Sequence, residues 1–261
     1  MTDPILQRSL PQMPWMQPAT ARLPGMQPLA SGDWLRVDEA HAGQMAERDR
    51  LIATLPDAVH ALLPEALPAA RELLELVLDT CRLLPGYAVG DGVVRRADGV
   101  AVALDADAPL LTLGRLVQED FCLHLPDGRG EHALVGAILC FPASWTLSEK
   151  LGRPLTGIHA PVDVYDADLA PRVQRLFDAL RPGRGLWRAN ALLYAEPDLF
   201  QPRRETDRRP KPAERHYLRS ERQCLIRLPE TGAVVFSIHT TVVHVRDVPP
   251  EALAAFRALH P

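Results

Sequence analysis

Aromatic residues are scarce in this chain, and long apolar runs are missing from it. Phe, Trp and Tyr make up 5% of the 261 residues, which argues against a surface built to stack nucleic-acid bases. The formal net charge is −4, without the basic balance that is typical of nucleic-acid binders. No run reaches the roughly 18 apolar residues that a membrane span needs. We therefore expect no nucleic-acid partner and no membrane partner.

Cysteine pairs and several familiar motifs are also missing. The four cysteines are far apart and form no C-x-x-C pair, which favours buried reduced thiols over a zinc site. Residues 1–18 lack the apolar core and the cleavage site of a signal peptide, so we expect a cytoplasmic protein. There is no P-loop, G-x-G-x-x-G, H-E-x-x-H or G-x-S-x-G, which argues against nucleotide hydrolysis, zinc proteolysis and standard serine hydrolysis.

The hydrophobic pattern predicts groups of helices and groups of strands. One buried helical face is predicted over residues 66–84, where apolar side chains recur at three- and four-residue spacing. Short helices are expected at 147–151, 166–180 and 250–259. Strands are expected at 100–104, 114–125, 132–142, 186–194, 221–228 and 233–245, with a hairpin turn at 229–232. Strands grouped in this way favour an antiparallel α+β fold, with residues 1–30 as an extended arm and 31–261 as one domain.

Among the nine histidines, His159 has the most suggestive surroundings. It follows a predicted short helix and lies between apolar neighbours in G-I-H-A-P-V, which would hold an imidazole at the wall of a pocket. A neutral imidazole there suits iron ligation if a second acceptor holds the other ring N–H, although a buried structural histidine is the alternative. His124 and His132 flank a tight turn and are expected to be exposed. His239 and His244 lie in the last strand, where hydrogen-bonded structural roles are expected.

Several short blocks, in order along the chain, resemble one known family. They are GRLVQEDF at 114–121, CFPASW at 140–145, EKLGRPL at 149–155, IHAPV at 158–162, WRAN at 187–190, DLFQP at 198–202 and LRSERQ at 218–223. Together they resemble the heme-dependent oxidative N-demethylases over residues 34–241. The chain departs from that pattern before residue 34, at Ala191, where a tryptophan is expected, and at His239, where an arginine is expected.

This resemblance implies a PAS-like antiparallel sheet that holds heme, and here heme b, since no C-x-x-C-H exists for covalent attachment. It implies that a small secondary amine is oxidised with O2 beside the iron and that formaldehyde is released. Electrons would come from NADPH through a flavin and iron–sulfur reductase, here a separate polypeptide, because ferredoxin cysteine spacing is missing. A tetrahydrofolate-binding subunit would capture the formaldehyde. A heme sensor without turnover and a cofactor-free scaffold subunit are the competing interpretations.

With this resemblance in view, His159 is the predicted iron ligand. Arg188 and Arg222 are predicted to contact heme propionates or the pocket, although cross-strand ion pairs with Glu221 or Glu119 would explain them equally well. Trp187 would line the pocket, or belong to the core. The predicted catalytic acids are Glu119 and Asp120, which would hold a protonated amine, the alternative being a solvated pair at a strand end. The basic loop 203–219 would dock an acidic redox partner, or be a solvated run of charges.

Overall fold

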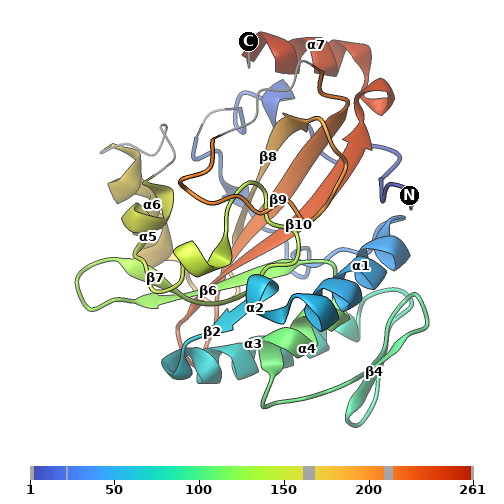
Figure 1. Ribbon diagram of the computed structural model, residues 1–261. Coiled ribbons are helices and arrows are strands. Elements are labelled where there is room, and N and C mark those ends of the chain that lie inside the picture. Colours follow the sequence, from blue (N-terminus) through green and yellow to red (C-terminus); the bar gives the residue numbers. More distant parts are fainter. Residues whose placement is uncertain (1–2, 22, 161–167, 209–213, 260–261) are drawn as a thin grey trace.

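The computed structural model describes residues 3–21, 23–160, 168–208 and 214–259. Its main layer is an antiparallel sheet of short and long strands (Figure 1). Seven strands form it in the order β1-β8-β9-β10-β6-β7-β2. Their bounds are β1 Gln27–Pro28, β2 His60–Leu62, β6 Asp120–Pro126, β7 His132–Ile138, β8 Leu186–Tyr194, β9 Tyr217–Arg227 and β10 Val234–His244. A second sheet holds three short strands, β3 Ala88–Val89, β4 Val93–Arg95 and β5 Ala101–Ala103. The predicted α+β class with an antiparallel sheet is confirmed.

The helices of the described residues fall into three groups around the large sheet (Figure 1). The first group is α1 His41–Thr54, α2 Pro56–Val59, α3 Leu67–Cys81 and α4 Pro109–Leu116. The second group, α5 Leu155–His159 and α6 Leu169–Ala179, lies on the left in Figure 1, and α7 Pro250–Leu259 lies at the top. Single 3-10 turns are η1 Pro14–Met16, η2 Pro64–Ala66, η3 Leu147–Glu149 and η4 Val245–Asp247.

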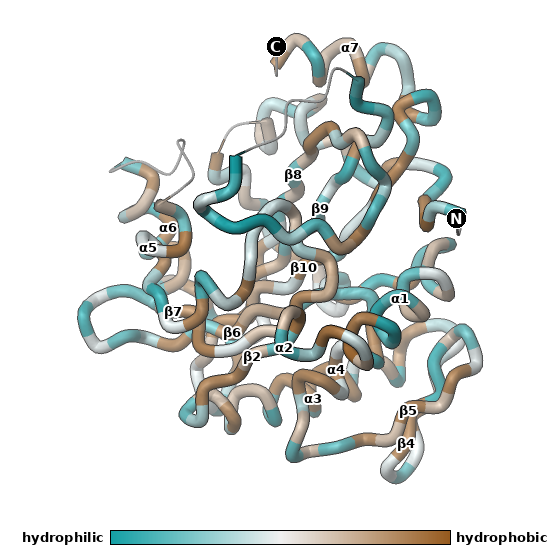
Figure 2. Tube along the Cα trace, in the orientation of Figure 1, coloured by the Kyte–Doolittle hydropathy of each residue, from teal (hydrophilic) through white to brown (hydrophobic). Residues whose placement is uncertain are grey.

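The main core lies between the sheet and the first helix group. The predicted helical face of α3 is confirmed, because Leu73, Leu74, Val77, Leu78 and Cys81 are all buried. Figure 2 shows hydrophobic residues concentrated in α3, α4 and the strands above them. Packing of this kind supplies most of the stability of a helix, since isolated helices of this length are marginal in water.

The strand predicted at residues 114–125 is wrong in its first part. Residues through Leu116 belong to α4, which starts at Pro109 and buries Leu110, Leu113 and Leu116 at three-residue spacing. A Cβ on Gly114 would lie 2.6 Å from Cγ1 of Ile138, so the glycine allows α4 to pack directly on β7. The strand itself begins at Asp120, after the chain has turned at Val117.

The N-terminal arm, residues 1–30, is hydrogen-bonded to the C-terminal part of the chain. Gln7 donates its backbone N–H to the Val242 carbonyl of β10 and accepts the Val242 N–H on its side-chain carbonyl, both at 2.9 Å. Trp15 donates its indole N–H to the Ala252 carbonyl at 2.8 Å and packs edge-on against Phe256 of α7. Farther along, β1 pairs with the first residues of β8. The arm therefore covers the end of the sheet beneath α7.

Two faces of the large sheet are covered by different helices. On β9, Cys224 packs into the core that contains α3 and α4, whereas Leu225 packs with Leu155 of α5 and Phe177 of α6. Because successive side chains of a strand point to opposite faces, this pair fixes the orientation of the whole sheet. We call the two sides the cap face, under α1, α3 and α4, and the α5–α6 face.

Candidate functional site

The cross-strand register divides the predicted site residues between these two faces. Trp187 pairs with Cys224, so it lies on the cap face. Arg188 pairs with Gln223, which lies beside Leu225 in alternation and therefore on the α5–α6 face. Arg222 falls on the cap face and His159, at the end of α5, on the other. The structure thus separates residues that the sequence placed in one pocket.

His159 is held in a single tautomer on the α5–α6 face. Its Nδ1 lies 2.8 Å from the Leu155 carbonyl oxygen one helical turn earlier. A carbonyl only accepts, so Nδ1 carries the proton and Nε2 carries the lone pair. Burial lowers the pKa of His159, its hydrogen bond to Leu155 opposes this, and the cations Lys150 and Arg188 add to the lowering. The result is a neutral imidazole of the kind that ligates a metal.

Arg188 on β8 is a half-buried cation close to that imidazole. Its guanidinium makes no hydrogen bond or ion pair within the described residues. Burial lowers its pKa, and the charge of Glu221 acts in the opposite direction. A guanidinium held in this way is suited to a carboxylate supplied by a ligand, because its planar donors match two oxygens at once.

Polar side chains continue along the same face, next to Arg188. Glu221 accepts hydrogen bonds on Oε2 from the side-chain amides of Asn190 and Gln223, each at 3.1 Å. Asn190 lies directly opposite Glu221 across the β8–β9 ladder. Sequence reasoning gave Glu221 no role beyond an ion pair. The alternation of Arg219, Glu221 and Gln223 along one strand is the signal that could have found them.

Two further histidines lie on this face, and the expectation that they are exposed is wrong. His124 is 5% exposed and His132 is 3% exposed. Both rings pack on Phe177 of α6, with centroids 5.4 and 5.3 Å away, because α6 folds over the β6–β7 hairpin. Burial, together with the nearby His132 and His159, lowers the pKa of His124 to about 3. His124 is therefore neutral at ordinary pH.

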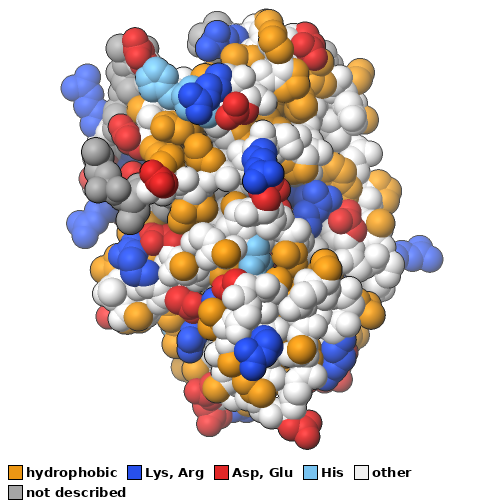
Figure 3. Space-filling model, turned by 90° about the vertical axis from the view of Figure 1, so that its right-hand side faces the viewer, with side chains coloured by type: hydrophobic (Ala, Val, Ile, Leu, Met, Phe, Trp, Pro, Cys, Tyr) orange, Lys and Arg blue, Asp and Glu red, His pale blue; other side chains and the backbone are white. Residues whose placement is uncertain are grey.

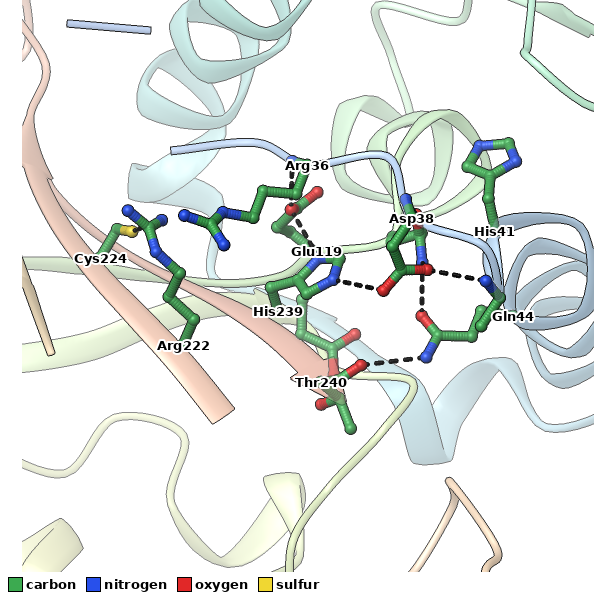
Figure 4. Close-up of polar contacts among 12 residues, drawn as sticks. Arg36, Asp38, His41, Gln44, Glu119, Arg222, Cys224, His239 and Thr240 are labelled. Carbon is green, nitrogen blue, oxygen red and sulfur yellow. Dashed lines mark hydrogen bonds and ion pairs between the residues drawn. The ribbon is translucent and has the colours of Figure 1, made fainter. Parts of the chain in front are cut away.

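The cap face holds a chain of charges around His239 (Figure 4). Its Nδ1 lies 2.9 Å from Glu119 Oε1 and its Nε2 lies 3.1 Å from Asp38 Oδ2. Burial opposes its protonation, but the bonds and charges of the two carboxylates prevail and raise its pKa to about 9. Glu119 Oε1 also accepts the Arg36 backbone N–H at 2.8 Å. Glu119 is fully buried, so the alternative of a solvated strand-end pair is wrong for this residue.

Asp120 is engaged inside the fold. Its carboxylate pairs with Arg48 at 2.7 Å, and both side chains are essentially without exposure. It also accepts the backbone N–H groups of Cys140 and Phe141 at 2.7 and 2.8 Å. The solvated alternative is wrong here as well. These bonds tie α1 to the start of β6 and the end of β7.

Arg222 and Trp187 contact each other on the cap face. The guanidinium lies 4.9 Å from the indole ring centroid, a cation–π distance. Arg222 pairs with Asp33 at 2.8 Å, and one of its N–H groups points at the sulfur of Cys224. The ion-pair partner is therefore Asp33, and neither Glu221 nor Glu119, the two partners that the sequence suggested.

The surface adds little that would compete with this arrangement. One hollow is lined by Pro24, Arg172, Arg175 and Leu176, and another by Asp127, Arg129, Glu131, Ala133, Gly152 and Pro154; His159 lines neither. Acidic and basic side chains are interspersed on the face in Figure 3. Within the described ranges there is no cluster of three or more His, Cys, Asp or Glu side chains fit for a metal ion. No helix in that part of the chain is long and apolar enough to cross a membrane.

The basic loop is described only in part. Glu205 in it pairs with Lys150 at 2.5 Å and with Arg153 at 3.0 Å, which ties the start of the loop to η3 and to the turn that follows it. Residues 209–213 lie outside the described residues, as do Pro161 and Val162 of the I-H-A-P-V block. The docking role of the loop stays a prediction.

Comparison with known proteins bears on this site. No curated protein was found to match the chain. The model of a protein family described as "haem-dependent oxidative N-demethylase, alpha subunit-like" matches residues 25–260. The match covers nearly the whole chain and both faces of the sheet. The resemblance that the sequence blocks suggested is confirmed. The match supports a broad heme dependence and a coarse oxidoreductase role, and its wording names one subunit of a larger assembly. The chain belongs to the haem-dependent oxidative N-demethylase alpha subunit-like family.

Proposed function

We propose that the protein binds heme b on the α5–α6 face and acts as the heme subunit of an oxidative N-demethylase for a small secondary amine. The observation that carries the proposal is His159, a neutral imidazole whose Nδ1 proton is fixed on the Leu155 carbonyl. Nε2 is the ring nitrogen that would bind iron, and the Leu155 carbonyl would orient the ring through Nδ1.

The donor set of this face fits the rest of the cofactor. Arg188, close to His159, offers a guanidinium that makes no hydrogen bond within the described residues, which suits a heme propionate. Apolar side chains of α5, α6 and the central strands flank the two residues, among them Ile158, Leu225 and Phe236. A PAS-like arrangement is supported by five successive long strands in which the last, β10, returns to lie beside the first, β6. The helices α5 and α6 are inserted between the second and the third of these strands.

When bound, heme would supply the oxidising chemistry toward O2 and the methyl group, so the chain's own tasks are binding, orientation and exclusion of water. Glu119 and Asp120 were the predicted amine partners, but each already has a partner inside the fold. His239 of β10 contacts Glu119, and Arg48 of α1 pairs with Asp120. We assign them to the scaffold, together with the Arg222–Trp187 contact. His159 and Arg188 then remain as the predicted cofactor-binding residues.

The proposal extends to partners, location and domain limits. Electrons would come from NADPH through a separate flavin and iron–sulfur reductase, and formaldehyde would pass to a tetrahydrofolate-binding subunit. The family's subunit name supports an assembly of this kind. Four buried cysteines without a disulfide agree with a cytoplasmic location. One continuous core from Trp34 to Val242 supports one domain over residues 31–261, with residues 1–30 as its arm.

Reconstitution with hemin tests the proposal. Wild type should take up about one equivalent and show a Soret band, and His159→Ala should lose the band or shift it while keeping its circular dichroism. The matched control is His216→Ala, which replaces an exposed histidine just before β9 and should behave as wild type. With a reductase and NADPH, wild type should release formaldehyde from dimethylamine.

Two results would count against the proposal. If the protein stays colourless after reconstitution, both the enzyme and the sensor interpretations fail. If it binds heme but releases no formaldehyde with a competent reductase, the heme-sensor interpretation replaces the enzyme.

A further inference from the structure

The two oxygens of Glu221 have different surroundings. Oε2 accepts both amide donors, from Asn190 and Gln223. Oε1 accepts no hydrogen bond within the described residues, and it forms a long ion pair with Nη2 of Arg219, at 3.7 Å. Glu221 is 7% exposed as a whole, and Oε1 is not among the buried polar atoms that lack a hydrogen-bond partner. This oxygen therefore keeps some contact with solvent and is accessible to a small ligand.

The orientation of this carboxylate is fixed rather than accidental. Asn190 Oδ1 accepts the backbone N–H of Glu221 at 3.0 Å, which turns its amide NH2 toward Oε2. Within the described residues, the side-chain amide of Gln223 donates only to Glu221. Two side chains are therefore used to hold one oxygen, and this leaves the other oxygen aimed away from them.

Arg219 is not available to close the open position. Its Nη1 donates to the Leu199 carbonyl at 2.9 Å, and its Nη2 donates to the Phe141 carbonyl. These two bonds tether the guanidinium to loops at the end of the sheet. Arg188, the other cation on this face, lies opposite Gln223 and forms no ion pair with Glu221.

A second unsatisfied group lies directly beside Glu221. Thr240 of β10 is the cross-strand partner of Glu221, so their side chains share a face. The hydroxyl of Thr240 is buried and has no hydrogen-bond partner in the part of the chain that the structure describes. Ile238 and Leu225 supply apolar surface next to this pair. Asn190 of β8, the partner of Glu221 on its other side, is only half-buried, so solvent reaches the Glu221 carboxylate from the β8 side.

We propose that Glu221 Oε1 binds the N–H of a small protonated secondary amine, with the Thr240 hydroxyl as a neighbouring polar contact. A carboxylate oxygen that accepts no hydrogen bond suits one compact cation, since a buried ammonium needs an anion close by. The same group would hold the amine beside the heme position on the α5–α6 face. The catalytic meaning of this site rests on the proposed function, whereas the binding of the cation does not.

Amine binding to the full-length protein without heme tests the inference. Calorimetric titration with dimethylammonium chloride at pH 7 should show one site in wild type. Glu221→Gln should raise the Kd by at least about tenfold, because a charge-assisted hydrogen bond is lost. Glu65→Gln, which removes an exposed carboxylate in η2, should leave the Kd unchanged. Tetramethylammonium has the same charge and no N–H, and it should bind at least about tenfold more weakly than dimethylammonium.

Gln223→Met guards against a folding defect in Glu221→Gln. It keeps the carboxylate but removes one of the two amides that orient it, so the Kd should rise by a smaller factor, roughly threefold. Unfolding midpoints of all variants identify any that are misfolded. If both Glu221→Gln and Gln223→Met fold and bind dimethylammonium as wild type does, or if tetramethylammonium binds equally well, the inference is overturned.

The two proposals can fail separately. Amine binding that depends on Glu221 in a protein that never takes up hemin would support the cation site and refute the proposed heme enzyme. A protein that demethylates dimethylamine with an unchanged Michaelis constant in Glu221→Gln would refute the cation site and support the enzyme.

Discussion

The cap face and the α5–α6 face of the large sheet use charged side chains in opposite ways. On the cap face, His239 lies between two carboxylates and Arg222 pairs with Asp33. On the α5–α6 face, Arg188 and one oxygen of Glu221 have no hydrogen-bond partner among the described residues, and the ion pair of that oxygen with Arg219 is long, at 3.7 Å. Paired charges join elements of the fold, whereas a group without a partner is available to a ligand. This difference separates scaffold from candidate site more clearly than residue type does.

The largest stability effect is expected at the Arg48–Asp120 pair. Arg48→Met should destabilise the protein by about 3–5 kcal/mol, because it leaves the Asp120 carboxylate buried without its cation. Urea unfolding monitored by circular dichroism measures the loss. Arg50→Met, on the exposed side of the same helix, should cost less than about 0.5 kcal/mol. A cost below about 1 kcal/mol for Arg48→Met would show that the attachment of α1 to the sheet does not depend on this pair.

His239 should make the cap face sensitive to alkaline pH. Its pKa is raised from 6.5 to about 9, so its contribution is fully present below pH 6.5 and is lost as the pH rises through about 9. The free energy of unfolding of wild type should fall relative to His239→Gln by on the order of 3 kcal/mol over that window. Urea unfolding of both proteins between pH 6 and pH 10 gives the difference, and a constant difference would contradict the raised pKa.

His124 should make the α5–α6 face sensitive to acid instead. Its pKa is lowered to about 3, so below pH 6.5 the unfolded chain binds a proton that the folded protein excludes. Wild type should lose on the order of 2 kcal/mol relative to His124→Gln between pH 6.5 and about pH 5. The same unfolding series, extended to acid, tests this. Parallel curves for the two proteins would mean that the ring is hydrated rather than buried.

The smallest stability effect is expected at Arg188. Arg188→Met removes a half-buried cation that forms no ion pair with any described residue, so the free energy of unfolding should change by less than about 0.5 kcal/mol or rise slightly. Hemin affinity should nevertheless fall, by roughly tenfold, if the guanidinium holds a propionate. Spectroscopic hemin titration and urea unfolding together test the claim. A large loss of stability would place Arg188 among the paired charges of the scaffold.

Local patterns predicted the elements well where one physical cause dominates. The apolar spacing of α3, the exact span of β8 at Leu186–Tyr194 and the β9–β10 hairpin follow from periodicity and turn residues. Residues 114–116 were predicted as the start of a strand but belong to the end of α4, because Leu and Val near Gly114 suit a strand as well as a helix, and tight packing on Ile138 decided the outcome.

The composition of the site was harder to predict than its location in the chain. Alternation tells which residues of one strand share a face, but not which face a neighbouring strand presents to them. Trp187 and Arg188 are adjacent in sequence and lie on opposite faces, and so do Glu221 and Arg222. The long-range partners Asp33 and Asp38 also come from a segment that no local pattern links to the sheet.

The contacts between the N-terminal arm and the C-terminal elements β10 and α7 have a consequence for biosynthesis. Gln7 and Trp15 are translated long before their partners Val242 and Ala252, which lie 235 and 237 residues later. Chains grow at about 5–20 residues per second, so the arm waits ~10–50 s without the contacts that hold it. During that interval the indole of Trp15 has no α7 to cover it, and a nascent-chain chaperone could bind there. Ribosome-bound intermediates should therefore expose the arm to protease until β10 and α7 have emerged.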